Sequence, residues 1–258
     1  MTGAPLDDRG LLLGDGLFET LLARDGQLIL LDEHLARMAG GCAVLGLPSP
    51  DASQARAACE TALDAAGLQR GRAAVRLTMT AGSGGRGLDR PEAPTPRLFA
   101  TAALAPPAGG VTALRTASIR RNTTSPASRL KSLSYLDNIL ARREVAPDEA
   151  LMLNERGEVA CAAVANIFWL MGDRLETPSL DCGVLPGIMR AHLVRAAADM
   201  GVEVREVRAP RAALDEADAV FLTNSLVGLR QVSSLDGVDL ASPPLVDALA
   251  EALGEVSS

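Results

Sequence analysis

A proline- and glycine-rich segment, Ala105-Pro106-Pro107-Ala108-Gly109-Gly110, divides the chain into two parts. Because proline and glycine favour turns and interrupt regular elements, this segment is the best candidate for a linker. The division predicts a smaller amino-terminal α+β domain over residues 1–105, a linker over 106–110 and a larger carboxy-terminal domain over 111–258. A chain of 258 residues is long enough for two such domains.

The first part alternates strand and helix patterns. The run from Leu17 to Ala23 is apolar enough for a buried strand, and Asp25-Gly26 matches a two-residue hairpin turn. Asp32 is a good N-cap for a helix in which apolar residues recur at helical spacing. The other elements expected here are a helix over residues 52–66 and strands over 75–80 and 97–104.

The second part contains more strands. Lys131 follows a polar loop and precedes a helix, on one face of which we expect Leu133, Leu136 and Leu140. The apolar run from Val159 to Met171 indicates a long buried strand. The other elements expected here are strands over 111–119, 149–153, 202–207 and 219–223, and helices over 188–200, 211–216 and 245–253.

Composition excludes several classes of function. Aromatic residues make up only 2% of the chain, so we expect a core of Leu, Val and Ala. The net charge of -7 argues against nucleic acid as a partner. The four cysteines lack CxxC spacing and are accompanied by only two histidines, so no metal site is expected.

The apolar segments give no sign of a membrane protein. The longest apolar run, 159–171, is too short to span a bilayer and contains Asn166. The stretch from Met1 to Asp8 lacks the charged-then-apolar pattern of a signal peptide. Isolated cysteines in apolar segments are typical of a reducing compartment. We therefore expect a soluble cytoplasmic protein.

Lys131 is the only lysine among the 25 lysines and arginines of the chain. Arginine stays protonated in proteins, whereas a partly buried lysine can lose its proton and act as a nucleophile or base. The functional interpretation is therefore a lysine that forms a Schiff base. The plain alternative is a surface lysine in a protein with an arginine-biased composition.

Six short motifs are each weak alone and strong together. They are Gly14-Asp15-Gly16-Leu17-Phe18-Glu19, His34-Leu35-Ala36-Arg37, Leu130-Lys131-Ser132-Leu133, Ala165-Asn166-Ile167-Phe168, Gly187-Ile188-Met189-Arg190 and Thr223-Asn224-Ser225. In this order they resemble the class IV, or fold type IV, pyridoxal-phosphate enzymes, which include branched-chain and D-amino-acid aminotransferases and aminodeoxychorismate lyase. The resemblance extends from Gly14 to about Val232, and several of its motifs look most like the lyase branch.

The resemblance implies a fold and a cofactor. The fold is α+β and α/β, with pyridoxal 5′-phosphate between a smaller amino-terminal domain and a larger domain with a mixed sheet. The resemblance places the Schiff base on Lys131 and implies that Arg37 pairs with the cofactor phosphate. It also implies that the phosphate rests on the backbone amides of Ile188 and Met189, with help from the Ser225 hydroxyl.

Two of these assignments also have support from physical chemistry. Gly187 at the start of a helix leaves free N–H groups and the positive end of the helix dipole, which together suit an anion. Arg37 supplies a charge-assisted fork for a phosphate. Taken singly, Gly187 is equally an ordinary turn residue, Arg37 a solvated helix charge and Ser225 a hydroxyl at a strand end. The resemblance also implies that Asn166, from the motif Ala165-Asn166-Ile167-Phe168, belongs to the cofactor site.

The segment Gly82-Ser83-Gly84-Gly85-Arg86-Gly87 satisfies the G-x-G-x-x-G pattern of dinucleotide-binding proteins. It does not open a helix, so the dinucleotide interpretation fails its test of context. We interpret it as a flexible loop beside the substrate, with Arg86 available for a carboxylate. Asn224 is a second candidate substrate ligand. Spacing does not choose among the other candidate arginines, which are Arg76, Arg120, Arg121 and Arg129.

Cys161 departs from the family pattern. The family usually places a glutamate five residues before the Asn of Asn166-Ile167-Phe168, where it keeps a proton on the pyridine nitrogen, and here Cys161 has that position. Glu158 lies three residues earlier, so on a regular strand it faces away from the Cys161 side. A slipped register or a bulge is required for Glu158 to replace the carboxylate. As a sequence feature alone, Cys161 is equally a small buried hydrophobe.

The thiol favours one chemistry over another. A neutral thiol, with an ordinary pKa of about 8.5, supports a protonated pyridine ring poorly. Transamination must hold a carbanion and reprotonate it, whereas elimination discharges electrons directly into a leaving group. Cys161 therefore favours a lyase over an aminotransferase, or marks a homologue with impaired or altered activity.

The hypothesis from sequence is a pyridoxal-phosphate-dependent lyase of folate biosynthesis that converts 4-amino-4-deoxychorismate to 4-aminobenzoate and pyruvate. The first alternative is a class IV aminotransferase for branched-chain or D-amino acids. The second is a cofactor-binding homologue without enzymatic activity. The expected ligand is a small-molecule substrate, and the resemblance alone implies a homodimer.

Overall fold

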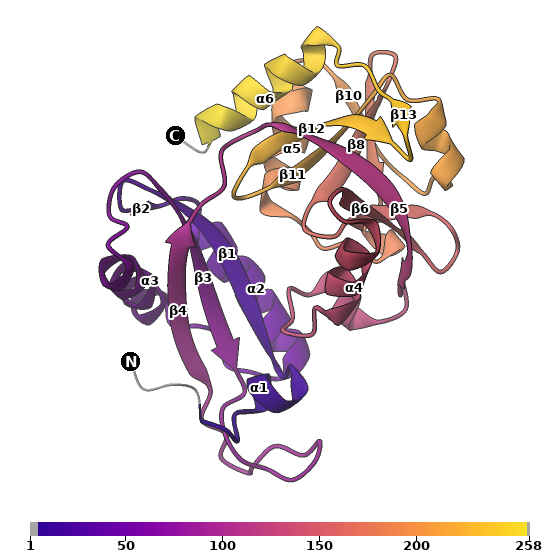
Figure 1. The fold of residues 1–258 in the computed structure, drawn as a ribbon. Coiled ribbons are helices and arrows are strands. Elements are labelled where there is room, and N and C mark those ends of the chain that lie inside the picture. Colours follow the sequence, from indigo (N-terminus) through magenta and orange to yellow (C-terminus); the bar gives the residue numbers. More distant parts are fainter. Residues whose placement is uncertain (1–4, 257–258) are drawn as a thin grey trace. The chain divides into compact units, whose positions relative to one another are not determined.

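The computed structural model describes residues 5–256 and divides into two compact units (Figure 1). Unit 1 contains the chain up to Pro106 together with the separate segment Leu130–Tyr135. Unit 2 contains Pro107–Arg129 and the chain from Leu136 onward. No helix in the described part of the chain is long and apolar enough to cross a membrane. Residues 1–4, which belong to the stretch inspected for a signal peptide, lie outside the described residues.

Unit 1 is an antiparallel sheet with helices packed on one face. Its elements are α1 (Arg9–Leu13), β1 (Gly16–Arg24), β2 (Gln27–Leu28), α2 (Leu31–Leu45), α3 (Ala52–Ala66), β3 (Arg72–Thr80) and β4 (Arg97–Leu104). The strand order is β2-β1-β3-β4, and every pair is antiparallel. Figure 1 shows α2 and α3 beside this sheet.

Alternation along the strands of unit 1 builds its core. Leu17 and Leu21 of β1 point toward the helices and pack with Leu77 of β3, Met38 of α2 and Leu63 of α3. Because neighbouring residues of a strand face opposite sides, Phe18 and Thr20 lie on the other face of the sheet.

Unit 2 is built around a nine-stranded mixed sheet. Its helices are η1 (Pro126–Arg129), α4 (Leu136–Val145), η2 (Leu180–Cys182), α5 (Ile188–Asp199), η3 (Arg211–Asp215) and α6 (Pro244–Val256). Its strands are β5 (Val111–Arg121), β6 (Glu149–Asn154), β7 (Val159–Ala162), β8 (Asn166–Met171), β9 (Arg174–Pro178), β10 (Glu203–Val207), β11 (Ala219–Asn224), β12 (Gly228–Leu235) and β13 (Val238–Asp239). Their order is β10-β9-β8-β11-β12-β5-β6-β7, and β13 pairs with β12.

Three of the six aromatic residues of the chain lie in the sheet of unit 2. Trp169, Phe168 and Phe221 are among the largest fully buried side chains of the described residues, and the rings of Phe168 and Phe221 stack with their centres 5.7 Å apart. The expectation of a core made only of Leu, Val and Ala is therefore wrong at this place. A strand pair such as β8–β11 brings opposite residues into contact, so a few aromatics can fill the centre of a sheet.

Three local expectations from the sequence need correction. Helix α2 begins at Leu31, so Asp32 lies in its first turn, where a carboxylate still benefits the helix dipole. The apolar run 159–171 forms two strands instead of one, because Ala162 N–H donates to the Ala165 carbonyl at 2.9 Å and closes a turn. Helix α4 begins at Leu136, after Leu133, and its apolar face is exposed.

Candidate functional site

Backbone hydrogen bonds hold the Lys131 segment against β1 in unit 1. Phe18 N–H donates to the Lys131 carbonyl at 2.9 Å, and Leu133 N–H donates to the Gly16 carbonyl at 3.0 Å. A Cβ at Gly16 would lie 2.3 Å from the Met79 carbonyl oxygen, so this close approach of β1 to β3 requires glycine. The pairing fixes Lys131 beside a strand that is far from it in sequence.

The amine of Lys131 has aromatic and cationic neighbours. Its side chain is half-buried, and Nζ lies 4.4 Å from the centre of the Phe18 ring and 5.5 Å from that of the Tyr135 ring. No hydrogen-bond acceptor or carboxylate partner contacts Nζ within residues 5–256. Burial lowers the pKa of Lys131, Arg37 lowers it further against the opposing charge of Glu19, and the result is about 8. Such an amine is partly neutral near neutral pH, as a nucleophile or base must be.

Arg76 of β3 shares the aromatic contact of Lys131. Its guanidinium carbon lies 3.6 Å from the centre of the Phe18 ring, and its charge also lowers the pKa of Lys131. Burial lowers the pKa of Arg76 itself, against a smaller opposing effect of Tyr135. Among the arginines that sequence spacing did not separate, Arg76 is therefore the one whose charge acts on the lysine.

Glu19, His34 and Arg37 form a network of hydrogen bonds between β1 and α2. Arg37 Nε donates to Glu19 Oε1 at 2.8 Å, and Arg37 Nη2 donates to Glu19 Oε2 at 2.5 Å. His34 Nδ1 lies 2.7 Å from the same Oε2. Burial alone would raise the pKa of Glu19, but the hydrogen bonds of Arg37 and His34 outweigh it and lower this pKa to about 2.

The ionised state of Glu19 determines the tautomer of His34. A carboxylate accepts and cannot donate, so the proton of His34 lies on Nδ1. Burial lowers the pKa of His34 more than Glu19 raises it, which keeps the ring neutral. The other ring nitrogen, Nε2, is buried without a hydrogen-bond partner in the described residues.

In unit 2, three elements meet at Asn166, the first residue of β8. Thr223 of β11 pairs with Asn166, and Asn166 Nδ2 donates to the Leu185 carbonyl at 3.0 Å. A Cβ at Gly187 would lie 1.9 Å from Asn166 Oδ1, so the start of α5 lies directly against this side chain. Asn166 and Gly187, two of the expected cofactor-binding residues, are therefore neighbours, and Ser225 follows the end of β11.

The start of α5 has the properties of an anion site. Gly187 is its N-cap and contributes no side-chain cap, so the amides of the first turn, which includes Ile188 and Met189, are not satisfied by a capping side chain. The hydroxyl oxygen of Thr223, in the strand that ends beside Asn166, is buried without a partner among residues 5–256. A buried hydroxyl without a partner is unusual and is explained by an acceptor that binds there. These residues fit a cofactor with a phosphate group.

Asn224 and Arg86, the two residues expected to bind the substrate, lie in different environments. Asn224 Oδ1 accepts hydrogen bonds from the amides of Leu226 and Val227 at 3.0 and 3.1 Å, so Asn224 shapes the turn after β11. Arg86 is exposed on the glycine-rich loop of unit 1. That loop, interpreted as flexible from sequence, is tied down by Arg9, whose guanidinium donates to the carbonyls of Leu88 and Asp89 at 2.8 and 2.9 Å.

Cys161 is a buried, neutral thiol in β7. It pairs with Met152 of β6 and packs with Cys182 and Val184. Burial raises the pKa of Cys161, and the nearby charge of Arg121 opposes this rise.

The strand that carries Cys161 contains a bulge. Cys161 pairs with Met152 and Val159 pairs with Leu153, so Ala160 is an extra residue between the two pairs. The expectation that Glu158 faces away from the Cys161 side assumed an unbroken strand. In the structure, Glu158 Oε2 contacts the Cys182 sulfur at 3.7 Å, in the cluster that also contains Cys161.

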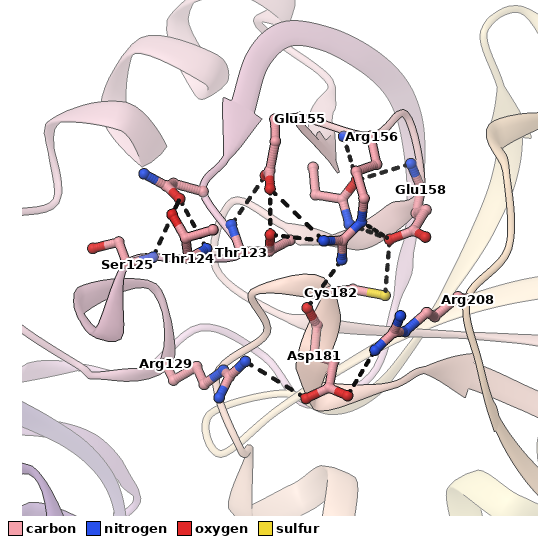
Figure 2. Close-up of polar contacts among 12 residues, drawn as sticks. Thr123, Thr124, Ser125, Arg129, Glu155, Arg156, Glu158, Asp181, Cys182 and Arg208 are labelled. Carbon is pink, nitrogen blue, oxygen red and sulfur yellow. Dashed lines mark hydrogen bonds and ion pairs between the residues drawn. The ribbon is translucent and has the colours of Figure 1, made fainter.

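Figure 2 shows that the carboxylate of Glu158 is already bound by its neighbours. Asn154 Nδ2 donates to Glu158 Oε2 at 2.6 Å, and Arg156 Nε donates to the same oxygen at 3.0 Å. Glu158 therefore belongs to a polar cluster at the end of β6 and β7. The bulge does not by itself make it a substitute for the missing carboxylate at position 161.

The rest of that cluster ties loops of unit 2 together. Arg156 Nη1 donates to the Thr123 hydroxyl at 3.0 Å, and Arg129 and Arg208 contact the Asp181 carboxylate at 3.5 and 2.9 Å (Figure 2). Arg121 Nε donates to the Gly183 carbonyl at 3.2 Å. Arg121 and Arg129, both candidate substrate ligands from sequence, are thus engaged by groups of unit 2.

Several residues near the lysine were not assigned a role from sequence. Glu19 and His34 belong to two of the six motifs, and the sequence pattern around each indicates a role in a site. Glu19 interrupts the apolar face of a buried strand, and His34 precedes Arg37 by three residues, which places both on one helical face. Phe18 gave no such signal, because its contact with Lys131 depends on how two distant segments pair.

Comparisons of the sequence with a family model and with known proteins agree on one family. A sequence model of the family described as amino-transferase class IV matches residues 16–235. An aminodeoxychorismate lyase from Bacillus subtilis is 32% identical over 241 residues, covering 91% of this chain and 82% of the relative. A putative branched-chain-amino-acid aminotransferase from Methanocaldococcus jannaschii is 33% identical over 239 residues, covering 89% of this chain and 82% of the relative.

Solved structures agree with this result. The crystal structure of 4-amino-4-deoxychorismate lyase from Pseudomonas aeruginosa superposes with a TM-score of 0.87 at 32% identity, and the match covers 99% of this chain and 96% of that one. The mixed α+β fold expected from the motifs is therefore confirmed.

Replacing Gly187 by alanine should displace the Asn166 side chain and weaken the anion site at α5. The loss of one buried hydrogen bond costs about 1 kcal/mol, so we expect a roughly fivefold weaker affinity for pyridoxal phosphate, measured by equilibrium dialysis. Gly254→Ala is the matched control, because a Cβ at Gly254 meets nothing within 4 Å. Equal affinities of the Gly187→Ala and wild-type proteins would contradict the close approach.

Replacing Lys131 by methionine should stabilise the protein at neutral pH. The pKa of Lys131 falls from 10.5 to about 8 on folding, so the unfolded chain binds more protons between these values and wild-type stability rises with pH across that window. The advantage of the variant should therefore be largest below pH 8 and shrink toward pH 10.5. Urea denaturation of both proteins across this range measures it, and an advantage independent of pH would contradict the lowered pKa.

Proposed function

This chain belongs to the amino-transferase class IV family, and on that premise we propose that it is a lyase that converts 4-amino-4-deoxychorismate to 4-aminobenzoate and pyruvate. The cofactor of the family is pyridoxal phosphate. The observation that carries the proposal is the position of the Lys131 amine beside the Phe18 and Tyr135 rings, in surroundings that lower its pKa.

Lys131 is the residue that moves protons in this proposal. When bound, pyridoxal phosphate withdraws electrons from the substrate carbon that carries the amine. The neutral Nζ of Lys131 takes the proton from that carbon and returns a proton to the departing three-carbon fragment. The two products together contain every atom of the substrate, so the elimination consumes no water and no oxidant. Nζ lies beside the Phe18 and Tyr135 rings, and its burial from water favours the neutral amine.

The proposed ligands of the cofactor are those that the resemblance to the family implies. In unit 1, Arg37 is proposed to pair with the phosphate. In unit 2, the amides of Ile188 and Met189 and the Ser225 hydroxyl are proposed to bind it as well. The uncapped start of α5 supports this assignment, and the unpartnered hydroxyl of Thr223 adds a donor. Asn166 is proposed to hold the start of α5 in place.

Arg76 is the proposed ligand of a substrate carboxylate. The substrate carries two carboxylates, and guanidinium groups bind carboxylates through paired hydrogen bonds. The charge of Arg76 acts on Lys131, and both cations contact the Phe18 ring, which supports this choice over the exposed Arg86. Asn224 is a weaker candidate, because its side-chain oxygen already accepts two backbone hydrogen bonds.

The buried thiol of Cys161 supports a lyase over an aminotransferase. Burial raises its pKa, so the thiol stays neutral and supplies no negative charge. Elimination into a leaving group depends less on a protonated pyridine ring than transamination does. The nearby Glu158 does not weaken this argument, because Asn154 and Arg156 bind its carboxylate.

A second candidate function is that of an aminotransferase for branched-chain or D-amino acids. The similarity to the Methanocaldococcus relative favours it, since that protein is a putative branched-chain-amino-acid aminotransferase at 33% identity. The two functions differ in whether the cofactor leaves the reaction unchanged or carries the amino group away.

We further propose a homodimer as the active form. Leu136, Ile139 and Leu140 present an exposed apolar stripe on α4, with exposed fractions of 64%, 53% and 39%. Apolar residues at this helical spacing suit a contact with a second copy.

An assay of both products tests the lyase directly. We expect protein loaded with pyridoxal phosphate to release equal amounts of 4-aminobenzoate and pyruvate from 4-amino-4-deoxychorismate. Lys131→Ala should lose at least about a hundredfold in rate, because it removes the general base. Release at background level would refute the lyase. Conversion of the cofactor to its pyridoxamine form by a branched-chain or D-amino acid would favour the second candidate.

Replacing Cys161 by glutamate should shift activity from elimination toward transamination. The new carboxylate would favour a protonated ring nitrogen, on which transamination depends more. We expect the ratio of transamination to aminobenzoate release to rise by about tenfold, which corresponds to about 1.4 kcal/mol. Cys161→Ser, which adds no charge, is the control. A ratio unchanged from wild type in the glutamate variant would show that position 161 does not act on the ring.

A further inference from the structure

The core of unit 1 contains a carboxylate at an inward position of β1. Glu19 lies on the same face of the strand as Leu17 and Leu21, which pack in the hydrophobic core, and it is 1% exposed. A carboxylate there without partners would take up a proton. The hydrogen bonds of Arg37 and His34 instead keep it ionised, with a pKa lowered to about 2. Glu19 is therefore a fixed negative charge.

That charge fixes the geometry of Arg37. Two hydrogen bonds, from Arg37 Nε to Oε1 and from Arg37 Nη2 to Oε2, hold the guanidinium in the plane of the carboxylate. His34 Nδ1 donates to Oε2 at 2.7 Å and so keeps the carboxylate itself from rotating. The orientation of Arg37 thus depends on Glu19, which is more deeply buried than Arg37 is.

The same charge acts on Lys131. Five groups face this amine or its immediate surroundings: Arg37 and His34 from α2, Glu19 from β1, Arg76 from β3 and Tyr135 from its own segment. Arg37 and Arg76 favour the neutral amine, and His34 is neutral. The carboxylate of Glu19 is the charge that raises the pKa of Lys131 and so favours the protonated amine.

We propose that Glu19 is a positioning residue that orients Arg37 and supplies the negative charge that balances the arginines around Lys131. Without it, Lys131 would face Arg37 and Arg76 unopposed, and its amine would release its proton at a lower pH. The inference rests on the proposed function only in taking Lys131 as the lysine that binds the cofactor. Its test needs no cofactor and no substrate.

The presence of a single lysine makes this test direct. The full-length protein, freed of cofactor, is acetylated with acetic anhydride at a series of pH values, and mass spectrometry follows the peptide that contains Lys131. The rate should report a pKa of about 8 in the wild type. Glu19→Gln should lower this value by about one unit, the lower end of the effect of a nearby opposite charge.

Two further variants separate charge from structure. Glu60→Gln removes a carboxylate from an exposed position of α3 and should leave the titration of Lys131 unchanged. Glu19→Asp keeps the charge and should stay closer to the wild-type value than Glu19→Gln does. A purely structural role of Glu19 would give no ordered difference between the Asp and Gln variants.

A double-variant cycle keeps the proposal testable if Glu19→Gln does not fold. Arg37→Gln should raise the pKa of Lys131, because Arg37 lowers it. Adding Glu19→Gln to that variant removes both charges of the pair, and it should bring the pKa back toward the wild-type value. Equal values in Arg37→Gln and in the double variant would overturn the proposal, as would an unchanged value in a folded Glu19→Gln protein.

Failure of the proposed function gives a different result. A wild-type Lys131 that titrates near its ordinary pKa of 10.5 would contradict the reactive, half-buried amine on which the proposed function depends. A lowered value that does not respond to Glu19 would leave that function intact and refute only the role of Glu19.

Discussion

The site in unit 1 depends on holding an amine partly out of water without a counterion. Lys131 contacts two aromatic rings, and the charges of Arg37 and Arg76 lower its pKa. The opposing charge, that of Glu19, is bound to Arg37. Desolvation and like charge both favour the neutral form of a lysine. Such an arrangement costs stability, because the folded protein must bury a group that prefers to be charged. Proteins accept such a cost mainly where chemistry requires it.

Strand β1 contributes residues both to the hydrophobic core of unit 1 and to the surroundings of Lys131. On one face of β1, Leu17 and Leu21 build the core and Glu19 anchors Arg37. On the other face, Phe18 receives the amine of Lys131, and the backbone of Phe18 pairs with the backbone of that lysine. Because the alternation of the strand separates these tasks, the packing of the core also fixes the position of the reactive group.

The sequence predicts most elements well, and it fails where register or packing decides. The motifs predict Lys131 and Arg37 as site residues, and in the structure the charge of Arg37 lowers the pKa of Lys131. No pattern could select Arg76 from several arginines, because the choice depends on which strand pairs beside Phe18. The sequence also does not predict the bulge at Ala160. The residues around it are all small and apolar, so an extra residue does not change the hydrophobic pattern of the strand.

The central claim is that the lone lysine holds the cofactor. Reduction of the loaded protein with sodium borohydride converts a Schiff base into a stable secondary amine, and mass spectrometry of the digested chain then locates it. The account predicts that the pyridoxyl phosphate group is found on the peptide that contains Lys131, at one group per chain. A reduced protein without that group, or with it only at the amino terminus, would contradict the account.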